Sequence, residues 1–303
     1  MAETDLLYMS AIVFIPAVFA LALIFIPRGK EEIMRWVSLF ATALTLGVSI
    51  GMFILFYNNT IDRNSIRPGR EEGRANATLD WRLHQLDKAA EGSGQPADDW
   101  LSRYPWIPRF HIDYYLGADG ISMPLVLLTT VLSFLAMIAS WKIDKFVRGY
   151  CMLFLLLETG MLGTFFALDF FLFYIFWEVM LLPMYFLIGV WGGPRREYAA
   201  IKFFLYTLLG SVFILIALLA FYFTDVRDFV SPNTVEAAAK QLEAQGVSAT
   251  DAQKNAVVNT FDLVVLQRVG KAALQILNNE PVTTSYRAKM ERENLDHLQE
   301  TKA

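Results

Sequence analysis

Three ionisable residues lie inside apolar stretches that are long enough to cross a membrane: Glu158, Glu178 and Lys202. Glu178 is the only formal charge in FFLFYIFWEVMLLPMYFLIGVW, residues 170–191. An ionised group at the centre of such a helix costs on the order of 3 kcal/mol on insertion scales, so the position predicts a functional site. Two acids and a base in one bundle, with trapped water, form a chain that could carry a proton, because moving one charge alters the proton affinity of the next.

Each of these residues also has a purely structural interpretation. Lys202 lies about three residues from the start of its stretch, where lysines often extend their ammonium groups to the interface. Glu158 could be a protonated carboxyl that bonds a neighbouring helix. Asp119 and Asp169 lie at the ends of apolar stretches and are predicted to cap helices. Three glycines are predicted to allow close helix packing rather than to bind a ligand: Gly160, Gly163 and Gly210.

The composition predicts an integral membrane protein. The 303 residues are 55% hydrophobic and only 18% charged, whereas soluble domains average about 25% charged residues. Most of the charge lies in two segments, 58–118 and 224–303. We expect an all-α fold, a polytopic membrane helix bundle of about six transmembrane helices. The predicted spans are about 7–26, 36–57, 121–141, 150–168, 170–191 and 200–223.

These spans divide the chain into four predicted parts. Residues 1–57 form a transmembrane hairpin of two helices, and 58–118 form an extracytoplasmic loop or insertion. Residues 119–223 form a four-helix transmembrane bundle with buried charges. Residues 224–303 form a polar tail, partly disordered, with an amphipathic helix for which Thr260 is a plausible cap.

The long loop and the tail differ in character along their length. Residues 60–100 are rich in charge and glycine and are predicted to be a solvated insertion. Residues 104–120 are aromatic and apolar enough to pack on the membrane surface. The last 17 residues are highly charged and predicted to be disordered.

Basic residues are concentrated in the loops that follow the first, third and fifth spans. Cytoplasmic loops carry an excess of Lys and Arg, so these three loops should face the cytoplasm. Both termini, the 58–118 segment and the tail should then lie on the non-cytoplasmic side. The basic residues are Arg28, Lys30, Arg35, Lys142, Lys145, Arg148, Arg195 and Arg196.

The sequence carries no pattern typical of a cofactor or metal site. Its one cysteine, Cys151, excludes an internal disulfide, and the three histidines are scattered. No phosphate-binding glycine loop and no dinucleotide fingerprint is present. We therefore expect this chain to bind no cofactor, no metal and no nucleic acid, and to contact the lipid bilayer. A stand-alone enzyme is disfavoured because no nucleophile–base pair is visible.

Three stretches carry a family resemblance. They are YPWIPRFHIDYYLGADGISMPLVLLTT (104–130), LLLETGMLGTFFALDFFLFYIFWEVMLLPMYFLIGVWGG (155–193) and REYAAIKFFLYTLLGSV (196–212). They resemble chain M of NADH-quinone oxidoreductase, respiratory complex I, more than its paralogues, chains L and N. Related antiporter and membrane-hydrogenase subunits share a looser form of the pattern.

The resemblance implies a role for each ionisable residue. Glu178 matches the family's essential fifth-helix glutamate, Glu158 its fourth-helix glutamate and Lys202 its sixth-helix lysine. The resemblance also implies that the chain lies in an energy-transducing membrane, such as the bacterial inner membrane, beside partner subunits of the chain L and N type. NADH, FMN, iron–sulfur clusters and quinone would be bound by other subunits.

The family has more helices than the six predicted here, and this leaves alternatives open. In the family, the counterpart of Glu178 pairs with a lysine on the seventh helix, yet no apolar span follows NTFDL (259–263). One expectation is a proton-translocating subunit completed by a second chain that carries the remaining helices. The alternatives are a cation/proton antiporter-type subunit, or a truncated structural or assembly subunit without transport activity.

Overall fold

The computed structural model describes residues 2–27, 29–65, 101–107, 110, 112–230, 232–244, 248–249, 251, 256–279 and 281–282. Its principal elements, in chain order, are helix α1 (Ala2–Ala22), helix α2 (Glu31–Ser65), strands β1 (Leu101–Ile107) and β2 (Ile112–Gly117), and helices α4 (Ser122–Ala139), α5 (Val147–Phe166), α6 (Phe170–Trp191), α7 (Arg196–Tyr222), α8 (Pro232–Ala244) and α10 (Leu263–Leu277). Short 3-10 turns (Leu23–Phe25, Ser140–Lys142 and Arg227–Phe229) follow α1, α4 and α7.

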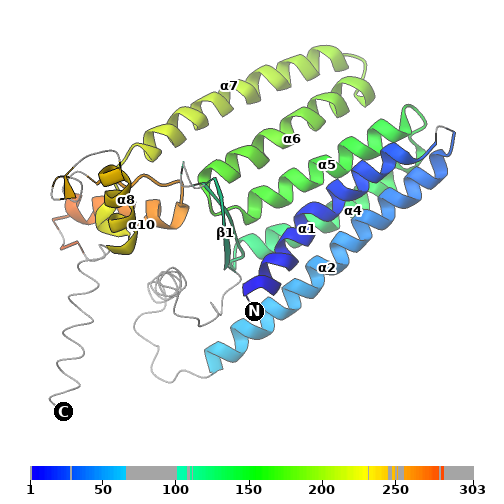
Figure 1. Cartoon of the computed structure of the whole chain (residues 1–303). Coiled ribbons are helices and arrows are strands. Elements are labelled where there is room, and N and C mark those ends of the chain that lie inside the picture. Colours follow the sequence, from blue (N-terminus) through cyan, green and yellow to red (C-terminus); the bar gives the residue numbers. More distant parts are fainter. Residues whose placement is uncertain are drawn as a thin grey trace.

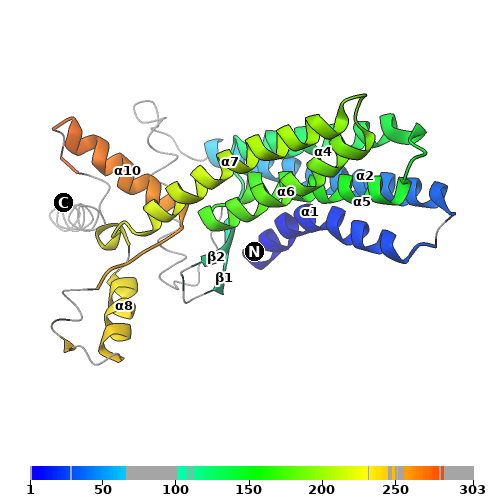
Figure 2. The same cartoon turned by 90° about the horizontal axis from the view of Figure 1, so that it is seen from above.

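Six of these helices, α1, α2 and α4 to α7, are long and apolar enough to span a membrane. They run side by side, and α8 and α10 lie beyond one end of the bundle (Figures 1 and 2). Helix α5 is central, since it contacts α1, α2, α4 and α6. Helix α7 packs along α6 at the edge of the bundle. The predicted all-α membrane bundle is thus confirmed.

The boundaries differ from the predicted spans in informative places. Helix α6 has the predicted bounds and continues through Pro183. Helix α2 begins earlier and ends later than the predicted span 36–57 and has 35 residues, so its last part extends into the segment predicted to be a solvated insertion. The remainder of that insertion and the last 17 residues lie outside the described residues.

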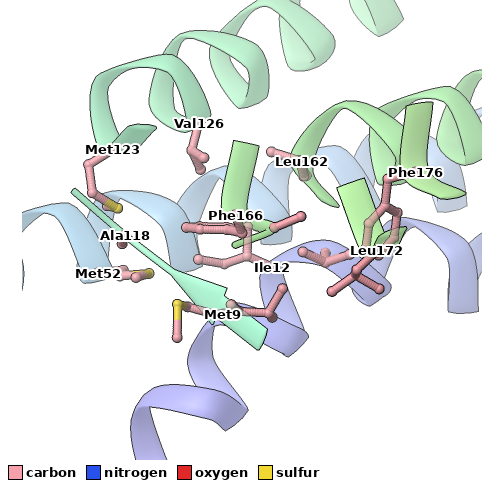
Figure 3. Close-up of a cluster of buried hydrophobic side chains, with 13 residues drawn as sticks. Met9, Ile12, Met52, Ala118, Met123, Val126, Leu162, Phe166, Leu172 and Phe176 are labelled. Carbon is pink, nitrogen blue, oxygen red and sulfur yellow. The ribbon is translucent and has the colours of Figure 1, made fainter. Parts of the chain in front are cut away.

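An apolar core fills the end of the bundle near the strands. It joins side chains from α1, α2, β2 and the start of α4, as well as from α5 and α6 (Figure 3). Burial of such side chains is the main favourable term in soluble proteins, but in lipid close packing itself holds helices together. The labelled members are Met9, Ile12, Met52, Ala118, Met123, Val126, Leu162, Phe166, Leu172 and Phe176.

The loops α1–α2, α4–α5 and α6–α7 lie at the opposite end of the bundle, which we call the basic end. Cations in and beside these loops make specific contacts there. Arg35 donates a hydrogen bond of 2.9 Å to the carbonyl of Ile143 and forms a 2.6 Å ion pair with Asp144. Arg148 donates to the carbonyl of Ile26, and Lys145 donates to that of Val190 at 3.3 Å. These residues therefore join the helix ends and loops at the basic end to one another, as well as carrying the charge bias.

Strands β1 and β2 form an antiparallel hairpin at the other end of the bundle. The sequence predicted only that this region packs on the membrane surface. Two further segments join the hairpin: Leu168 donates to the carbonyl of Tyr115 at 2.9 Å, and Leu263 donates to that of Leu168 at 3.0 Å. The chain before α10 is thereby fixed to the connection between α5 and α6.

Candidate functional site

Glu158 lies in the middle of α5 and is fully buried. Neither carboxyl oxygen has a hydrogen-bond partner among the described residues. The buried Ser133 of α4 approaches this carboxyl, although without the geometry of a hydrogen bond. A buried polar atom without a partner carries a free-energy cost of about 1–3 kcal/mol, so its presence calls for an explanation.

The direction of Glu158 follows from the glycines beside it. A Cβ at Gly160 would lie 2.5 Å from Cγ of Met180, and a Cβ at Gly163 would overlap the ring of Phe176. These glycines therefore let α6 approach α5 closely, as predicted. Glu158 is two residues before Gly160, which is about 200° of helical rotation. It points away from α6, toward α4.

The third glycine of that prediction behaves differently. A Cβ added at Gly210 on α7 would meet no described residue within 4 Å. The prediction that Gly210 allows close packing is therefore wrong for the contacts within the described part of the chain. The reason is that α7 has few neighbours here, since only 11% of its most apolar window is buried.

Glu178 lies in the middle of α6 and is half-buried. It is two residues from both Phe176 and Met180, which face α5, so it lies on the opposite side of the helix, toward α7. Its Oε1 is buried and has no hydrogen-bond partner among the described residues. The hydroxyl of Tyr174, one turn earlier, lies beside this carboxyl and accepts a 3.4 Å hydrogen bond from Ser211 of α7.

Lys202 lies in the first part of α7, and its side chain is exposed. Its Nζ is 5.8 Å from the centre of the Tyr198 ring, a distance at which a cation and an aromatic face attract each other. No hydrogen bond or ion pair joins Glu158, Glu178 and Lys202 to one another within the described part of the chain. The two carboxyls point to opposite sides of the α5–α6 pair.

Sequence reasoning missed the polar neighbours of both glutamates. Tyr174 precedes Glu178 by four residues, a helical spacing that places the two on one face and could have identified it. Ser133 and Ser211 carry no comparable signal, because single serines are common within membrane helices. Only the packing of α4 on α5 shows that Ser133 approaches Glu158, and only the packing of α7 on α6 shows that Ser211 bonds Tyr174, the neighbour of Glu178.

A second polar cluster lies outside the spans, at the strand end. Arg103 of β1 pairs with Asp113 at 2.5 Å and with Asp262 at 3.0 Å. Burial opposes the charged form of Arg103, but the carboxylates of Asp262 and Asp113 outweigh it and raise the pKa of the guanidinium. This cluster joins the hairpin to the start of α10.

Aspartates cap the helices near this cluster. Asp169 accepts hydrogen bonds from the backbone N–H groups of Phe171 and Leu172, and a third from that of Asp113. Burial raises the pKa of Asp169 to about 6 despite these bonds. Asp119 likewise accepts from the N–H of Ser122 at the start of α4. Both predicted caps are confirmed.

The predicted cap of the tail helix needs correction. Asp262, rather than Thr260, caps α10, because its carboxylate accepts from the N–H groups of Val264 and Val265. Thr260 instead accepts a 3.0 Å hydrogen bond from the N–H of Asp262. In the described ranges, no group of three or more His, Cys, Asp or Glu side chains could hold a metal ion.

Comparisons with known protein families match two adjacent parts of the chain. Residues 100–168 match the family described as NADH-ubiquinone oxidoreductase chain 4, amino terminus. Residues 167–265 match the family described as NADH:quinone oxidoreductase/Mrp antiporter, TM. The second match contains Glu178 and Lys202, and the first contains Glu158.

Curated relatives and solved structures agree with these matches. NADH-quinone oxidoreductase subunit M of Rhodobacter capsulatus is 37% identical over 231 residues, 74% of this chain and 38% of the relative. Subunit M of Rickettsia conorii is 44% identical over 131 residues, 43% of this chain and 27% of the relative. This chain thus spans about a quarter to two-fifths of the length of these curated relatives.

The fold is similar to that of a chain in the membrane-bound sulfane sulfur reductase, an archaeal respiratory membrane complex. The TM-score is 0.50 at 18% identity, over 71% of this chain and 37% of that chain. At this identity the likeness concerns the fold alone.

Proposed function

Because this chain is a homologue of the chain M, or chain 4, antiporter-like subunits of respiratory complex I, we propose that it is a membrane subunit of a proton-pumping NADH:quinone oxidoreductase. Its role is to contribute an intramembrane pathway for protons. Quinone is reduced elsewhere in the complex, and NADH, FMN, iron–sulfur clusters and quinone are bound by other subunits.

Glu178 is the charge-switching carboxylate in this proposal. The observation that carries it is the position of this residue: mid-membrane on α6, with one buried oxygen unpartnered, and beside the Tyr174 hydroxyl. Such a group can hold a proton or release it to a neighbour, and the Tyr174 hydroxyl beside it is a group to which it can pass one. Glu158 and Lys202 are coupled groups on either side of it.

The open face of α7 supports a proposal about partners. Lys202 is exposed on a helix that packs along α6, and the relatives are much longer than this chain. Further helices, from the rest of a longer protein or from a second chain, would cover α6 and α7 and supply a cation for Glu178. Subunits of the chain L and N type would be further neighbours.

The basic end supports a proposal about orientation. Three loops with Lys and Arg in them or beside them lie there, while the hairpin and α10 lie at the other end. By the positive-inside rule the basic end faces the cytoplasm. The membrane would be the bacterial inner membrane or an equivalent energy-transducing membrane, with both termini on the non-cytoplasmic side.

The proposal is tested by Glu178→Gln in the assembled complex. Gln keeps the size and the polarity of the side chain but cannot exchange a proton. NADH-driven proton uptake by inside-out membrane vesicles should fall at least about tenfold, while the amount of assembled complex stays constant. Glu197→Gln, at the exposed start of α7, is the matched control and should pump normally.

Two other functions predict different results. Unimpaired pumping by Glu178→Gln, or a loss of assembly without any loss of specific pumping, would favour a structural subunit. The second matched family description also includes the Mrp antiporter, so a cation/proton antiporter-type subunit is the other candidate. Sodium-dependent transport in vesicles that is insensitive to quinone-site inhibitors would favour it.

A further inference from the structure

A file of buried hydroxyls runs along α2 and is not used in the mechanism above. Ser38, Thr42, Thr45 and Ser49 recur at helical spacing on one face, and all four are fully buried. In many membrane helices, a stripe of small hydroxyl residues serves close helix packing and nothing else. Its surroundings distinguish it from that case.

The register of the helices places this file beside Glu158. Ser49 hydrogen-bonds Thr130 of α4 at 2.9 Å, and Ser38 lies next to Cys151 of α5. Helices α2 and α5 both start at the basic end, so they run in the same direction. Seven residues beyond Ser38 is Thr45, and seven beyond Cys151 is Glu158, so these two lie at the same depth.

Helix α4 closes the third side at that depth. It runs in the opposite direction to α2, so the residue one turn beyond Thr130 on α4 lies level with the residue one turn before Ser49 on α2. These residues are Ser133 and Thr45. Glu158, whose two carboxyl oxygens have no partner in the described part of the chain, therefore lies between two hydroxyl-bearing helices.

The hydroxyls have hydrogen-bonding capacity left. Ser38, Thr42 and Thr45 donate to backbone carbonyls of their own helix, at 2.8, 3.0 and 2.9 Å. A hydroxyl that donates in this way still has lone pairs that can accept. Each can therefore hold a water molecule by accepting from it, which is what a single file of water beside Glu158 requires.

The file of buried hydroxyls extends from the middle of α2 toward the basic end only. A pocket at the basic end is lined by Met34 and Val147, among others, and these residues lie one turn before Ser38 and Cys151. In the other direction, beyond Ser49 and Thr130, the apolar core of Met52, Met123, Val126 and Leu162 fills the space (Figure 3). Toward the basic end, the space between α2, α4 and α5 thus holds hydroxyls among buried apolar side chains such as Met34 and Leu155, whereas toward the strand end apolar side chains alone fill it.

We infer that Ser38, Thr42 and Thr45 of α2, with Ser133 of α4, line a water-filled entry route for protons from the basic end to Glu158. From Met34, which lines the pocket at the basic end, to Thr45 the route is about 16 Å long, at 1.5 Å per residue. Met34, Met137 and Leu155 form its apolar walls, and the flexible methionines are side chains that can make way for water. A proton passes from water to water and is taken up at a carboxylate oxygen of Glu158. The inference rests on the proposed function of the chain.

Cysteine accessibility tests the route without requiring the complex to pump. The only native cysteine is replaced first, as Cys151→Ser, and Thr42→Cys and Thr45→Cys are then made separately in the full chain in its native membrane. Val126→Cys, in the sealed core, is the matched control. A small charged methanethiosulfonate added from the side of the basic loops should modify both route positions several-fold faster than the control. Modification no faster than at Val126→Cys, or faster from the strand side, would overturn the route.

Hydroxyl removal tests whether the route carries protons. Thr45→Val keeps the shape of the side chain and leaves no donor unpaired, because Thr45 donates only to its own helix. It should slow NADH-driven pumping several-fold, as should Ser133→Ala. Thr129→Val, on the exposed side of α4 and also bonded to its own helix, is the control and should have no effect. Normal pumping by Thr45→Val, with pumping lost in Glu178→Gln, would overturn the route and leave the proposed function standing. Normal pumping by both would overturn both.

Discussion

Two regions of this molecule differ in how far they bury the ionisable side chains of the predicted membrane spans. In the enclosed region, formed by α1, α2, α4 and α5, the most apolar window of α5 is 44% buried and Glu158 is fully covered. In the open region, formed by α6 and α7, the corresponding values are 17% and 11%, and Lys202 is exposed. Within the described residues, helices of this chain enclose Glu158, whereas Glu178 lies between α6 and a helix, α7, that is itself largely exposed.

The difference indicates which parts of the proposed proton pathway would depend on other polypeptide. Glu158 has its hydroxyl neighbours within this chain, from α2 and α4. Glu178 has Tyr174 beside it, but no ion pair joins it to a cation among the described residues, although a carboxylate in a membrane interior usually pairs with one. The enclosed region should thus keep its properties in this chain alone, whereas the open region should depend on its partners.

The largest expected effect on stability comes from a change at the contact between α5, in the enclosed region, and α6, in the open region. Gly163→Ala would drive a methyl group into the ring of Phe176 and push α6 away from α5. We expect a loss of about 3 kcal/mol of stability, the upper range for overpacking. Thermal unfolding of the protein in detergent measures it. Gly210→Ala on α7 is the control, because its Cβ meets nothing, and it should stabilise by about 0.5–1 kcal/mol. Equal shifts for both variants would contradict the close α5–α6 contact.

The polar cluster at the strand end should matter less. Arg103→Met removes two ion pairs and leaves Asp262, at the cap of α10, without its cation. We expect a loss of about 1–2 kcal/mol, since the guanidinium is 46% exposed and partly screened by water. Hydrogen exchange of residues 256–279 should become faster. Lys240→Met, which breaks an exposed pair with Glu236, should leave exchange unchanged.

A substitution of Glu158, the enclosed carboxyl, should reduce pumping without reducing stability. Glu158→Leu removes two buried oxygens that have no partner among the described residues, so the unfolding temperature should stay the same or rise slightly. Pumping by the assembled complex should fall, because the proton acceptor is gone. A clear drop in the unfolding temperature would indicate instead that Glu158 is a bonded structural group.

A pH effect outside the spans should be the smallest. The pKa of Asp169 is raised from 3.8 to about 6, so the native protein binds its proton more tightly than the unfolded chain does. The stabilisation is present below the unfolded pKa and is lost as pH rises from about 4 to 6. Asp169→Asn should reduce this slope in the unfolding temperature. An unchanged slope would show that other groups cause it.

The features that the sequence predicts correctly are those whose residues lie close together along the chain. Six apolar runs are local patterns, and the bounds of α6 and the caps Asp119 and Asp169 followed from them. Strand β1 was not predicted, because Pro105 and scattered aromatics obscure the alternation of a strand. The pairing of Arg103 with Asp262 joins positions 159 residues apart, and no local pattern predicts it.

The site shows the same limit. Glu158 and Glu178 stand out because a charge in an apolar run is visible in one dimension. The hydroxyls of α2 do not stand out, because Ser and Thr are ordinary in membrane helices. Their alignment with Ser133 and Glu158 depends on the register between three helices, which only the packing shows.

The most direct test of this account is a structure, by cryo-electron microscopy, of the complex that contains this chain, purified from its native membrane. We expect helices from outside residues 1–303 to pack along α6 and α7 and to place a basic side chain within hydrogen-bonding distance of Glu178. A structure in which α7 faces lipid and Glu178 has no cation beside it would contradict the claim that this carboxyl is the switching group of a proton pathway.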